Sequence, residues 1–352
     1  MSIKYIYWFA PYNLKCPSTK YRGKYPIDYL IDTIGIRCKF FYPEKSFRAK
    51  LKFCIMVVSI LFFRRKNSLV VIQKVCTNNR YAKTLRLLIK LKSNKSLYDL
   101  DDAEYIRYDK STLEFFLKNC ESVSVGSSAL YDYVKPLNSS VFHQTSPVVL
   151  HHNQKIKRNK ILHIGWVGDL GNGNALSKPF SHKTNMFKLF FPELRKIDFP
   201  VKLTLVGVKN KDDIPLIKNY FKNQPHIKIE IPTNLDWEND AWIYSMISDF
   251  DIGIAPMTNH LFNRSKSAFK AKQYLSTGVP TIACDVGDTN MYVKHGLNGF
   301  LVTEHFSYAD AIKKIAGMSD EDYFNLSTNA LNSRINYSME NYCLNLLNHF
   351  KT

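Results

Sequence analysis

The sequence predicts an α/β protein built from two doubly wound halves. Short apolar runs of strand length alternate with helical patterns along the chain. This rhythm stops at a charged polar stretch, residues 155–160, and then starts again. Strands that alternate with helices form parallel sheets, which bind ligands at the carboxyl ends of their strands. A chain of 352 residues, 45% of them hydrophobic, is long enough for two domains with a core each.

The first half, residues 1–150, is expected to form one domain. Residues 80–91 have the spacing of an amphipathic helix, and residues 26–34 form another helix, which Gly35 ends. We expect the polar residues 11–25 to be a loop. The expected strands are residues 5–9, 37–42, 69–73, 96–98 and 123–125.

The second half, residues 151–335, repeats the alternation after a connection that we expect near residues 145–160. An amphipathic helix is expected over residues 336–352, at the end of the chain. The first four expected strands of this half are residues 161–167, 202–206, 227–231 and 251–255.

An apolar run at residues 53–63 lies between basic flanks and has two possible interpretations. It is too short to span a bilayer, so it is either a core helix of the first domain or an interfacial helix whose flanks contact anionic lipid. The flanking cations are Lys45, Arg48, Lys50, Lys52, Arg64, Arg65 and Lys66.

The positive charge is concentrated in the first half. The whole chain carries a formal charge of +19, and residues 1–150 hold 25 Lys and Arg against 11 Asp and Glu. Nucleic acid, an anionic membrane surface or a phosphorylated acceptor could be the partner, and lysine-rich composition bias explains part of the total. We expect no nucleic-acid binding, because the chain has no helix-turn-helix, RNP or zinc-finger motif. The seven cysteines are scattered without a C-x-x-C, which indicates a reducing compartment, the cytoplasm.

The most informative run is residues 263–302. A polar, basic loop is followed by an amphipathic helix over residues 266–276, which Gly278 and Pro280 end. Residues 279–284 are then a short apolar strand, as expected for a strand covered on both faces. Free backbone N–H groups and cationic side chains at the start of a helix bind anions, so this run predicts a phosphate or diphosphate site.

Three motifs in this run resemble, in order and spacing, the nucleotide-sugar-binding segment of GT-B glycosyltransferases, family 4 in particular. They are Ser276-Thr277-Gly278-Val279-Pro280, Asp285-Val286-Gly287 and Asn298-Gly299-Phe300. The resemblance implies two Rossmann-like domains that face a cleft. Residues 1–150 would bind the acceptor and residues 151–335 the nucleotide-sugar donor. It also implies that the helix over residues 336–352 crosses back to the first domain.

The resemblance further implies a variant donor site. The family has two glutamates eight positions apart at this helix, and Ser265 and Gln273 stand in their places, so we expect Gln273 to contact the ribose. In the family a glycine turn, here ending at Gly168, and a later lysine, here Lys183 or Lys178, contact the diphosphate. The candidate donor-binding residues are Gly168, Lys183, Arg264, Ser265, Lys266, Ser267, Lys270 and Gln273.

Three carboxylates, Asp99, Asp101 and Asp102, come directly after the strand expected at residues 96–98. Such spacing can bind a divalent metal, hold a general base or cap a helix. The resemblance implies that Asp101 and Asp102 occupy the positions of a His-Asp pair in the family. They are therefore the candidate catalytic residues, and no metal or other cofactor is expected.

Residues 17–22 follow the first strand, where the family has a glycine-rich loop. Here the glycines are missing, and Ser18, Thr19 and Arg22 are the candidates for binding an acceptor or a phosphate. The planar guanidinium group suits a phosphate. A solvated basic loop is the alternative.

Together these features predict a glycosyltransferase that uses a nucleotide-diphosphate sugar. The acceptor would be a hydroxyl of a glycan or lipid-linked glycan in bacterial lipopolysaccharide or capsule synthesis. The resemblance implies retention of the anomeric configuration. The protein would be cytoplasmic and peripheral on the anionic membrane face. The alternatives are a GT-B sugar-nucleotide epimerase, a nucleic-acid-binding protein and an inactive donor-binding scaffold.

Overall fold

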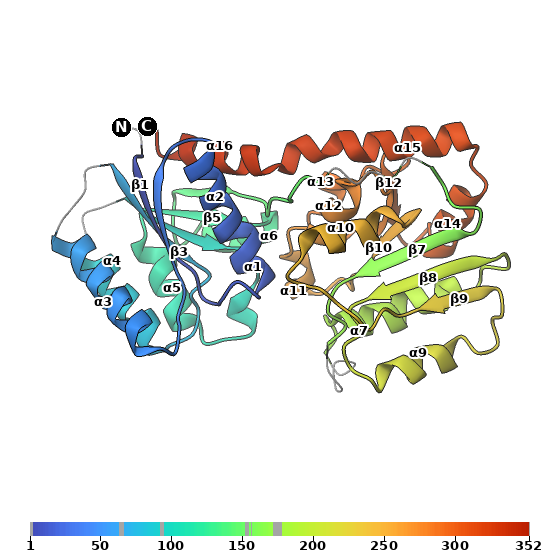
Figure 1. The fold of residues 1–352 in the computed structure, drawn as a ribbon, viewed down its shortest axis with the longest axis horizontal. Helices are drawn as coiled ribbons and strands as arrows, with labels where there is room; N and C mark the ends of the chain where they lie inside the picture. The colour runs from blue at the N-terminus through green and yellow to red at the C-terminus, as the bar shows by residue number, and fades with distance from the viewer. Residues whose placement is uncertain are drawn as a thin grey trace. The chain divides into compact units, whose positions relative to one another are not determined.

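The structure, a computed structural model, describes residues 3–62, 67–91, 95–151, 155, 157–171 and 178–351. It consists of two compact units (Figure 1). Unit 1 comprises Met1–Val149, Ser265–Ser267 and Tyr337–Thr352, and unit 2 comprises Leu150–Arg264 and Ala268–Asn336. Each unit holds one six-stranded sheet, so the predicted class of two doubly wound α/β halves is confirmed. The domain bounds expected from the sequence stay a prediction.

The sheet of unit 1 is parallel, with the strand order β2-β1-β3-β4-β5-β6. The order reverses between β1 and β3, so the loops that leave these strands diverge there, and ligands bind at such points in open α/β sheets. The strands are β1 (Tyr5–Phe9), β2 (Arg37–Phe41), β3 (Ser68–Gln73), β4 (Lys95–Leu100), β5 (Ser122–Val125) and β6 (Val141–His143).

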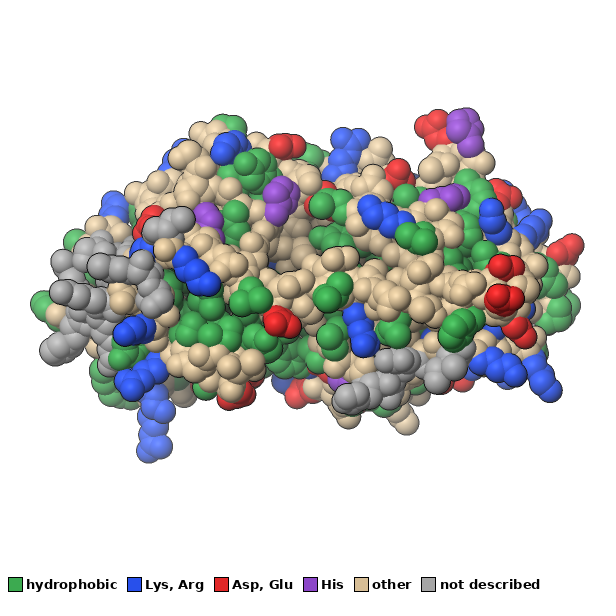
Figure 2. Space-filling model, turned by 90° about the horizontal axis from the view of Figure 1, so that it is seen from above, with side chains coloured by type: hydrophobic (Ala, Val, Ile, Leu, Met, Phe, Trp, Pro, Cys, Tyr) green, Lys and Arg blue, Asp and Glu red, His purple; other side chains and the backbone are tan. Residues whose placement is uncertain are grey.

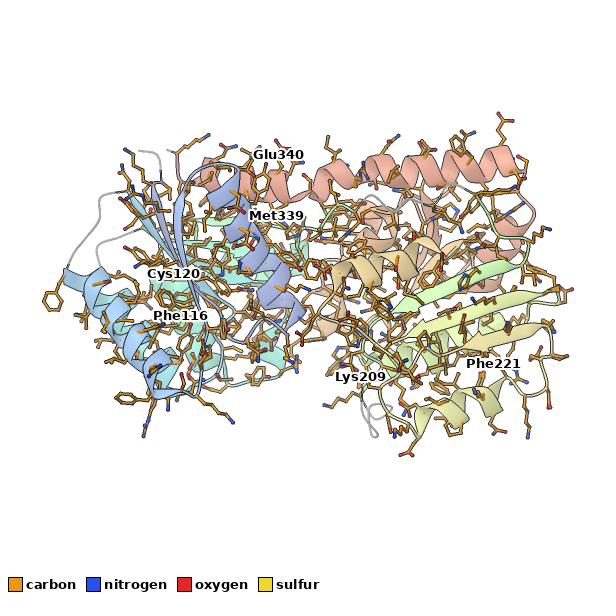
Figure 3. The ribbon with its side chains drawn as sticks, viewed as in Figure 1. Phe116, Cys120, Lys209, Phe221, Met339 and Glu340 are labelled. Carbon is orange, nitrogen blue, oxygen red and sulfur yellow. The ribbon has the colours of Figure 1, made fainter. Side chains whose placement is uncertain are left out.

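Helices cover both faces of this sheet (Figure 1). On one face, α2 and the final helix α16 share a core with β1, β3 and β4, so the predicted C-terminal helix packs in unit 1. On the other face, Phe53 of α3 packs on Phe9 of β1. Phe116 of α5, labelled in Figure 3, stacks on Tyr98. The two ring centroids are 5.5 Å apart. The helices are α1 (Pro17–Thr19), η1 (Lys20–Lys24), α2 (Tyr25–Asp32), α3 (Phe47–Phe62), α4 (Arg80–Leu91), η2 (Glu104–Ile106), α5 (Lys110–Asn119), α6 (Ser128–Val134) and α16 (Met339–His349).

The prediction of a loop over residues 11–25 is wrong for the second half of this segment. There, α1 and the π-helical turn η1 lead directly into α2. Tyr21, Arg22 and Gly23 of this turn are buried. A Cβ at Gly23 would lie 2.6 Å from Gln73 Oε1, so the turn packs tightly onto the sheet. Tertiary packing, rather than apolar periodicity, therefore makes this polar segment helical.

The sheet of unit 2 is also parallel and has the order β12-β11-β10-β7-β8-β9, which is the order of a Rossmann fold. Its switch point lies between β7 and β10. The strands are β7 (Leu162–Val167), β8 (Val201–Val206), β9 (Ile227–Glu230), β10 (Ile252–Ala255), β11 (Thr281–Cys284) and β12 (Gly299–Val302). The helices are α7 (His182–Asn185), η4 (Met186–Phe190), α8 (Phe191–Leu194), α9 (Asp213–Tyr220), α10 (Asp240–Ser248), α11 (Leu261–Arg264), α12 (Phe269–Leu275), α13 (Thr289–Tyr292), α14 (Tyr308–Ala316) and α15 (Asp320–Asn332), with η5 (Ser333–Tyr337) after them.

The helix expected over residues 266–276 begins three residues later, as α12. Ala268 adopts the left-handed conformation, with φ +51°, so the chain turns sharply before the helix starts. At the other end Gly278 has φ +75°, which confirms the predicted stop. The predicted strand that follows is β11.

Basic side chains are spread over the face of unit 1 seen from above (Figure 2). No helix in the described parts of the chain is both long and apolar enough to cross a bilayer. Residues 53–62 of the predicted apolar run belong to α3, whereas its flanking residues Arg64, Arg65 and Lys66 lie outside the described residues.

Candidate functional site

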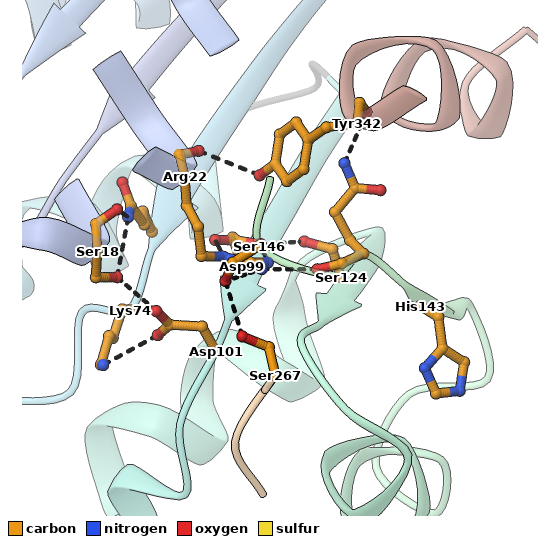
Figure 4. A network of polar contacts seen from close by, with 12 residues as sticks. Ser18, Arg22, Lys74, Asp99, Asp101, Ser124, His143, Ser146, Ser267 and Tyr342 are labelled. Carbon is orange, nitrogen blue, oxygen red and sulfur yellow. Dashed lines mark hydrogen bonds and ion pairs between the residues drawn. The ribbon is translucent and has the colours of Figure 1, made fainter. Parts of the chain in front are cut away.

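A polar network in unit 1 lies around the carboxyl ends of β3 and β4 (Figure 4). Its centre is a buried ion pair between Arg22 and Asp99, each 1% exposed. Arg22 Nε donates to Asp99 Oδ2 at 2.9 Å, and Nη2 donates to Oδ1. Nη1 donates to the Gln144 carbonyl at 2.7 Å and to Ser146 Oγ at 3.2 Å. All three nitrogens of the guanidinium group are therefore engaged inside the protein.

Asp99 also stabilises the protonated, charged form of Arg22. Burial works to lower the pKa of Arg22, but Asp99 beside it raises that pKa well above its usual value. Ser124 Oγ donates to Asp99 Oδ1 at 2.6 Å, and Tyr342 of α16 donates its hydroxyl to the Arg22 carbonyl at 3.1 Å. Arg22 thus links η1 to β4, to the segment after β6 and to α16. Binding a phosphate, as the sequence suggested, would require this network to open.

Asp101, one of the two candidate catalytic residues, lies next to this pair. Ser18 Oγ donates to Asp101 Oδ2 at 2.6 Å, and Lys74 Nζ lies 3.0 Å from Oδ1. Burial works to raise the pKa of Asp101, but Lys74 and Arg22 lower it below its usual value. Ser18 therefore orients a carboxylate, whereas Thr19 is fully buried. The predicted acceptor or phosphate contacts of Ser18 and Thr19 stay predictions.

Lys74 gathers three carboxylates at the end of β3. Its Nζ pairs with Asp102, with Asp101, and with Glu104 Oε1 at 3.1 Å. Burial works to lower the pKa of Lys74, but these carboxylates raise it well above its usual value. Burial also raises the pKa of Glu104, and Lys74 opposes that rise. Lys74 has φ +48°, in the left-handed region, which a lysine adopts at a cost in free energy.

Sequence reasoning missed Lys74 and Glu104. A signal was present for Lys74, because it comes directly after the strand expected at residues 69–73, where polar side chains face the ligand side of a parallel sheet. Glu104 gave no such signal, because it lies in the short turn η2 and reaches the cluster only through packing.

Three predicted donor residues, Ser265, Lys266 and Ser267, belong to unit 1 rather than to the unit that holds α12. Ser127 Oγ donates to the Ser265 carbonyl at 2.9 Å, and Ser267 Oγ donates to Ser146 Oγ at 3.1 Å. Burial lowers the pKa of Lys266, and Asp102 opposes that effect. This segment therefore lies against the carboxylate cluster, and its contact with a donor stays a prediction.

Unit 2 carries a second group of candidates at the carboxyl ends of β7 and β8, beside the switch point of its sheet. The Lys270 side chain crosses Gly168, where a Cβ would lie 2.6 Å from Lys270 Cε. Lys270 Nζ lies 3.1 Å from His182 Nε2 and 5.8 Å from the centre of the Trp166 ring. At Gly207, φ is +116°, and a Cβ would overlap the Gly168 carbonyl oxygen. Gly168 thus lets the Lys270 side chain lie close to the backbone, and Gly207 lets the backbone after β8 lie close to the backbone after β7. A diphosphate site requires such close approach of the backbone.

The other predicted residues of unit 2 are engaged differently. Lys183 is buried and pairs with Asp213 at 2.5 Å, with side chains 4% and 3% exposed. Binding a diphosphate through Lys183 would separate this pair, so Lys270 is the better-placed cation. Arg264 is exposed and donates from Nε to Asn259 Oδ1 at 2.6 Å, and Gln273 is 7% exposed. The donor roles of all these residues stay predictions.

Comparisons with known proteins agree with this architecture. Residues 177–317 match the family model of glycosyl transferases group 1. No curated protein sequence matches the chain.

Solved glycosyltransferases have the same fold at low sequence identity. A glycosyltransferase from Rickettsia africae is 15% identical, with a TM-score of 0.64 over 99% of this chain and 98% of that one. HepE of Anabaena, in complex with UDP and glucose, is 12% identical, with a TM-score of 0.63 over 97% and 98%. The lipopolysaccharide outer core galactosyltransferase WaaB is 13% identical, with a TM-score of 0.64 over 98% of both chains. The two Rossmann-like sheets, the terminal helix in unit 1 and these solved structures show that the chain has the GT-B fold, and its residues 177–317 are similar to glycosyl transferases group 1.

Proposed function

We propose that the protein transfers a sugar from a nucleotide-diphosphate sugar to a hydroxyl group of a growing glycan. The observation that carries this proposal is the close approach of Gly168, Gly207 and Lys270 to one another, beside the switch point of the unit 2 sheet. As the bond between the anomeric carbon and the diphosphate breaks, negative charge develops on the leaving nucleotide. A cation and backbone amides placed there in advance stabilise this charge.

The proposed acceptor is a glycan or lipid-linked glycan of bacterial surface polysaccharide, lipopolysaccharide or capsule. The likeness to WaaB, a lipopolysaccharide outer core galactosyltransferase, supports this choice. The concentration of Lys and Arg in residues 1–150 supports a place at the anionic cytoplasmic face of the membrane. We keep retention of the anomeric configuration as part of the proposal, with Asp101 and Asp102 beside the acceptor.

Two alternatives differ from transfer in simple assays. A sugar-nucleotide epimerase would change its donor without any acceptor, and an inactive scaffold would bind the donor without turning it over. A nucleic-acid-binding protein would retain DNA or RNA on a filter in a salt-sensitive way.

Donor binding is tested by replacing the lysines of the predicted site. We expect Lys270→Ala and Lys266→Ala each to weaken nucleoside-diphosphate binding by about 1–3 kcal/mol, because a hydrogen bond to a charged group is lost. Calorimetry on the parent and on each variant measures this loss. The control is Lys218→Ala, which removes an exposed lysine of α9. Unchanged binding of every nucleotide sugar in both variants would refute the phosphate assignment.

Turnover is expected to survive excess chelator. The carboxylates that would attract a divalent ion, Asp101, Asp102 and Glu104, already surround the Lys74 ammonium group, which occupies the place of a cation. Activity is measured in EDTA with and without added Mg²⁺ or Mn²⁺. This expectation would be overturned if the parent were active only with added Mg²⁺ or Mn²⁺ and if Asp101→Asn abolished this metal dependence. Such a result would assign the cluster to metal binding.

A further inference from the structure

Helix α3 presents apolar side chains on two opposite sides. On the inner side Met56, Val57 and Ile60 are buried, and Phe53 packs on Phe9 of the sheet. On the outer side five large apolar residues follow one another at intervals of four, four, three and four residues, which places them on one face of the helix. This outer stripe consists of Phe47 (79% exposed), Leu51 (50%), Ile55 (58%), Val58 (49%) and Phe62 (76%).

Cations border the outer stripe on both sides. At about 100° per residue, Arg48 and Lys52 follow one edge of the stripe and Lys50 follows the other. All three are exposed, as is Lys45 just before the helix. No Asp or Glu occurs in α3. The helix thus combines a core face, an exposed apolar stripe and a purely basic margin.

The charge of this margin decides which partner fits the stripe. Isolated exposed apolar residues are ordinary on protein surfaces. Five such residues on one face of a helix, over about four turns, indicate a surface that a membrane or another molecule covers. A second copy of the chain would bring the cations of two α3 helices together. Nucleic acid could stack bases on the two phenylalanines, but it offers no apolar phase for the aliphatic Leu51, Ile55 and Val58 between them. An anionic bilayer matches both features, because its headgroups attract the cations and its acyl boundary accepts the stripe.

We infer that α3 is an interfacial helix, which lies in the plane of an anionic membrane with its outer stripe inserted below the headgroups. The inner face keeps the helix attached to unit 1, whose sheet it covers (Figure 1). The inference rests on the proposed function only in that a lipid-linked acceptor would lie in the same membrane. It explains why residues 53–62 carry more apolar surface than the core of unit 1 uses.

Vesicle binding of the full chain, without donor or acceptor, tests the inference. The stripe variant is Leu51→Gln, Ile55→Gln and Val58→Gln, and the matched control is Leu216→Gln, Leu261→Gln and Phe324→Gln. The control removes three comparably exposed apolar residues of unit 2. We expect the parent and the control to float with phosphatidylglycerol-containing vesicles. The affinity of the stripe variant for these vesicles should fall by about tenfold or more.

Insertion is distinguished from adsorption by salt and by a probe. The charge variant Arg48→Gln, Lys50→Gln and Lys52→Gln should lose affinity and salt dependence together. Cys54 is exposed beside the stripe and takes an environment-sensitive fluorophore once Cys16 and Cys38 are serine. Its emission should shift to the blue on anionic vesicles and stay unchanged on phosphatidylcholine alone.

Three results would each overturn the inference. They are a parent that binds no vesicles, a stripe variant that binds like the parent, and a parent dimer that the stripe variant converts to a monomer. Nucleotide binding by the stripe variant is measured in parallel. Loss of vesicle binding with donor binding intact supports the membrane helix by itself, and absent donor binding in the parent would refute the proposed function alone.

Discussion

Replacing Arg22 with methionine is expected to lower the free energy of unfolding by about 3–5 kcal/mol. The substitution leaves Asp99 charged, 1% exposed and without its main partner. It also removes the donors to the Gln144 carbonyl and Ser146 Oγ. Urea denaturation of the parent and the variant measures the difference, because the linear extrapolation gives both free energies.

The control for this variant is Arg80→Met, at the exposed start of α4, which should change stability by about 0.5 kcal/mol or less. Arg22→Lys should recover only part of the loss, since an ammonium group cannot reproduce the two parallel bonds to Asp99. A stable Arg22→Met variant with weakened phosphate binding would return Arg22 to the ligand role that the sequence suggested.

Much of the fold could be predicted from the sequence because both sheets are buried and parallel. Their strands appear as short apolar runs, and the strand expected at residues 5–9 and the helix expected at residues 80–91 coincide with β1 and α4. The helical turn η1 could not be predicted, since its polar residues are held by contacts with distant segments. Tyr342 reaches the Arg22 carbonyl from 320 positions away.

The candidate site, like the fold, could be predicted only in part from the sequence. Asp101 and Asp102 could be located because they directly follow a strand, and parallel sheets gather such residues at one edge. Their shared partner Lys74 directly follows the neighbouring strand β3, and only the pairing of β3 with β4 brings the three residues together. The burial of Lys183 against Asp213 could not be predicted either, because nothing in the local sequence distinguishes a buried lysine from a phosphate-binding one.

The conformation of residues 265–268 shows a further limit. Helical spacing over residues 266–276 predicted one continuous element, yet Ala268 turns the chain and α12 begins at Phe269. Ser265–Ser267 are held instead by unit 1, through Ser127 and Ser146. Periodicity cannot reveal such a break, because the contacts that stabilise it come from residues more than a hundred positions away.

Replacing Gly207 with alanine is expected to destabilise unit 2 by about 3 kcal/mol or more and to abolish donor binding. The residue has φ +116°, a backbone region that alanine rarely adopts, and its Cβ would overlap the Gly168 carbonyl oxygen. Neither backbone group can yield without separating the ends of β7 and β8, so strain and overpacking add together. Denaturant unfolding and calorimetry with nucleoside diphosphates measure the two effects.

Gly296→Ala is the matched control. Gly296 has φ +77°, but among the described residues no atom beyond its chain neighbours lies within 4 Å of the place that a Cβ would take. This variant should lose about 1 kcal/mol from backbone strain alone and keep donor binding. The difference between the two variants isolates the close approach of Gly207 to Gly168, on which the proposed diphosphate site depends. If Gly207→Ala folds as stably as Gly296→Ala and binds nucleotides like the parent, the two glycines have no special role, and the donor site must be sought elsewhere in the chain.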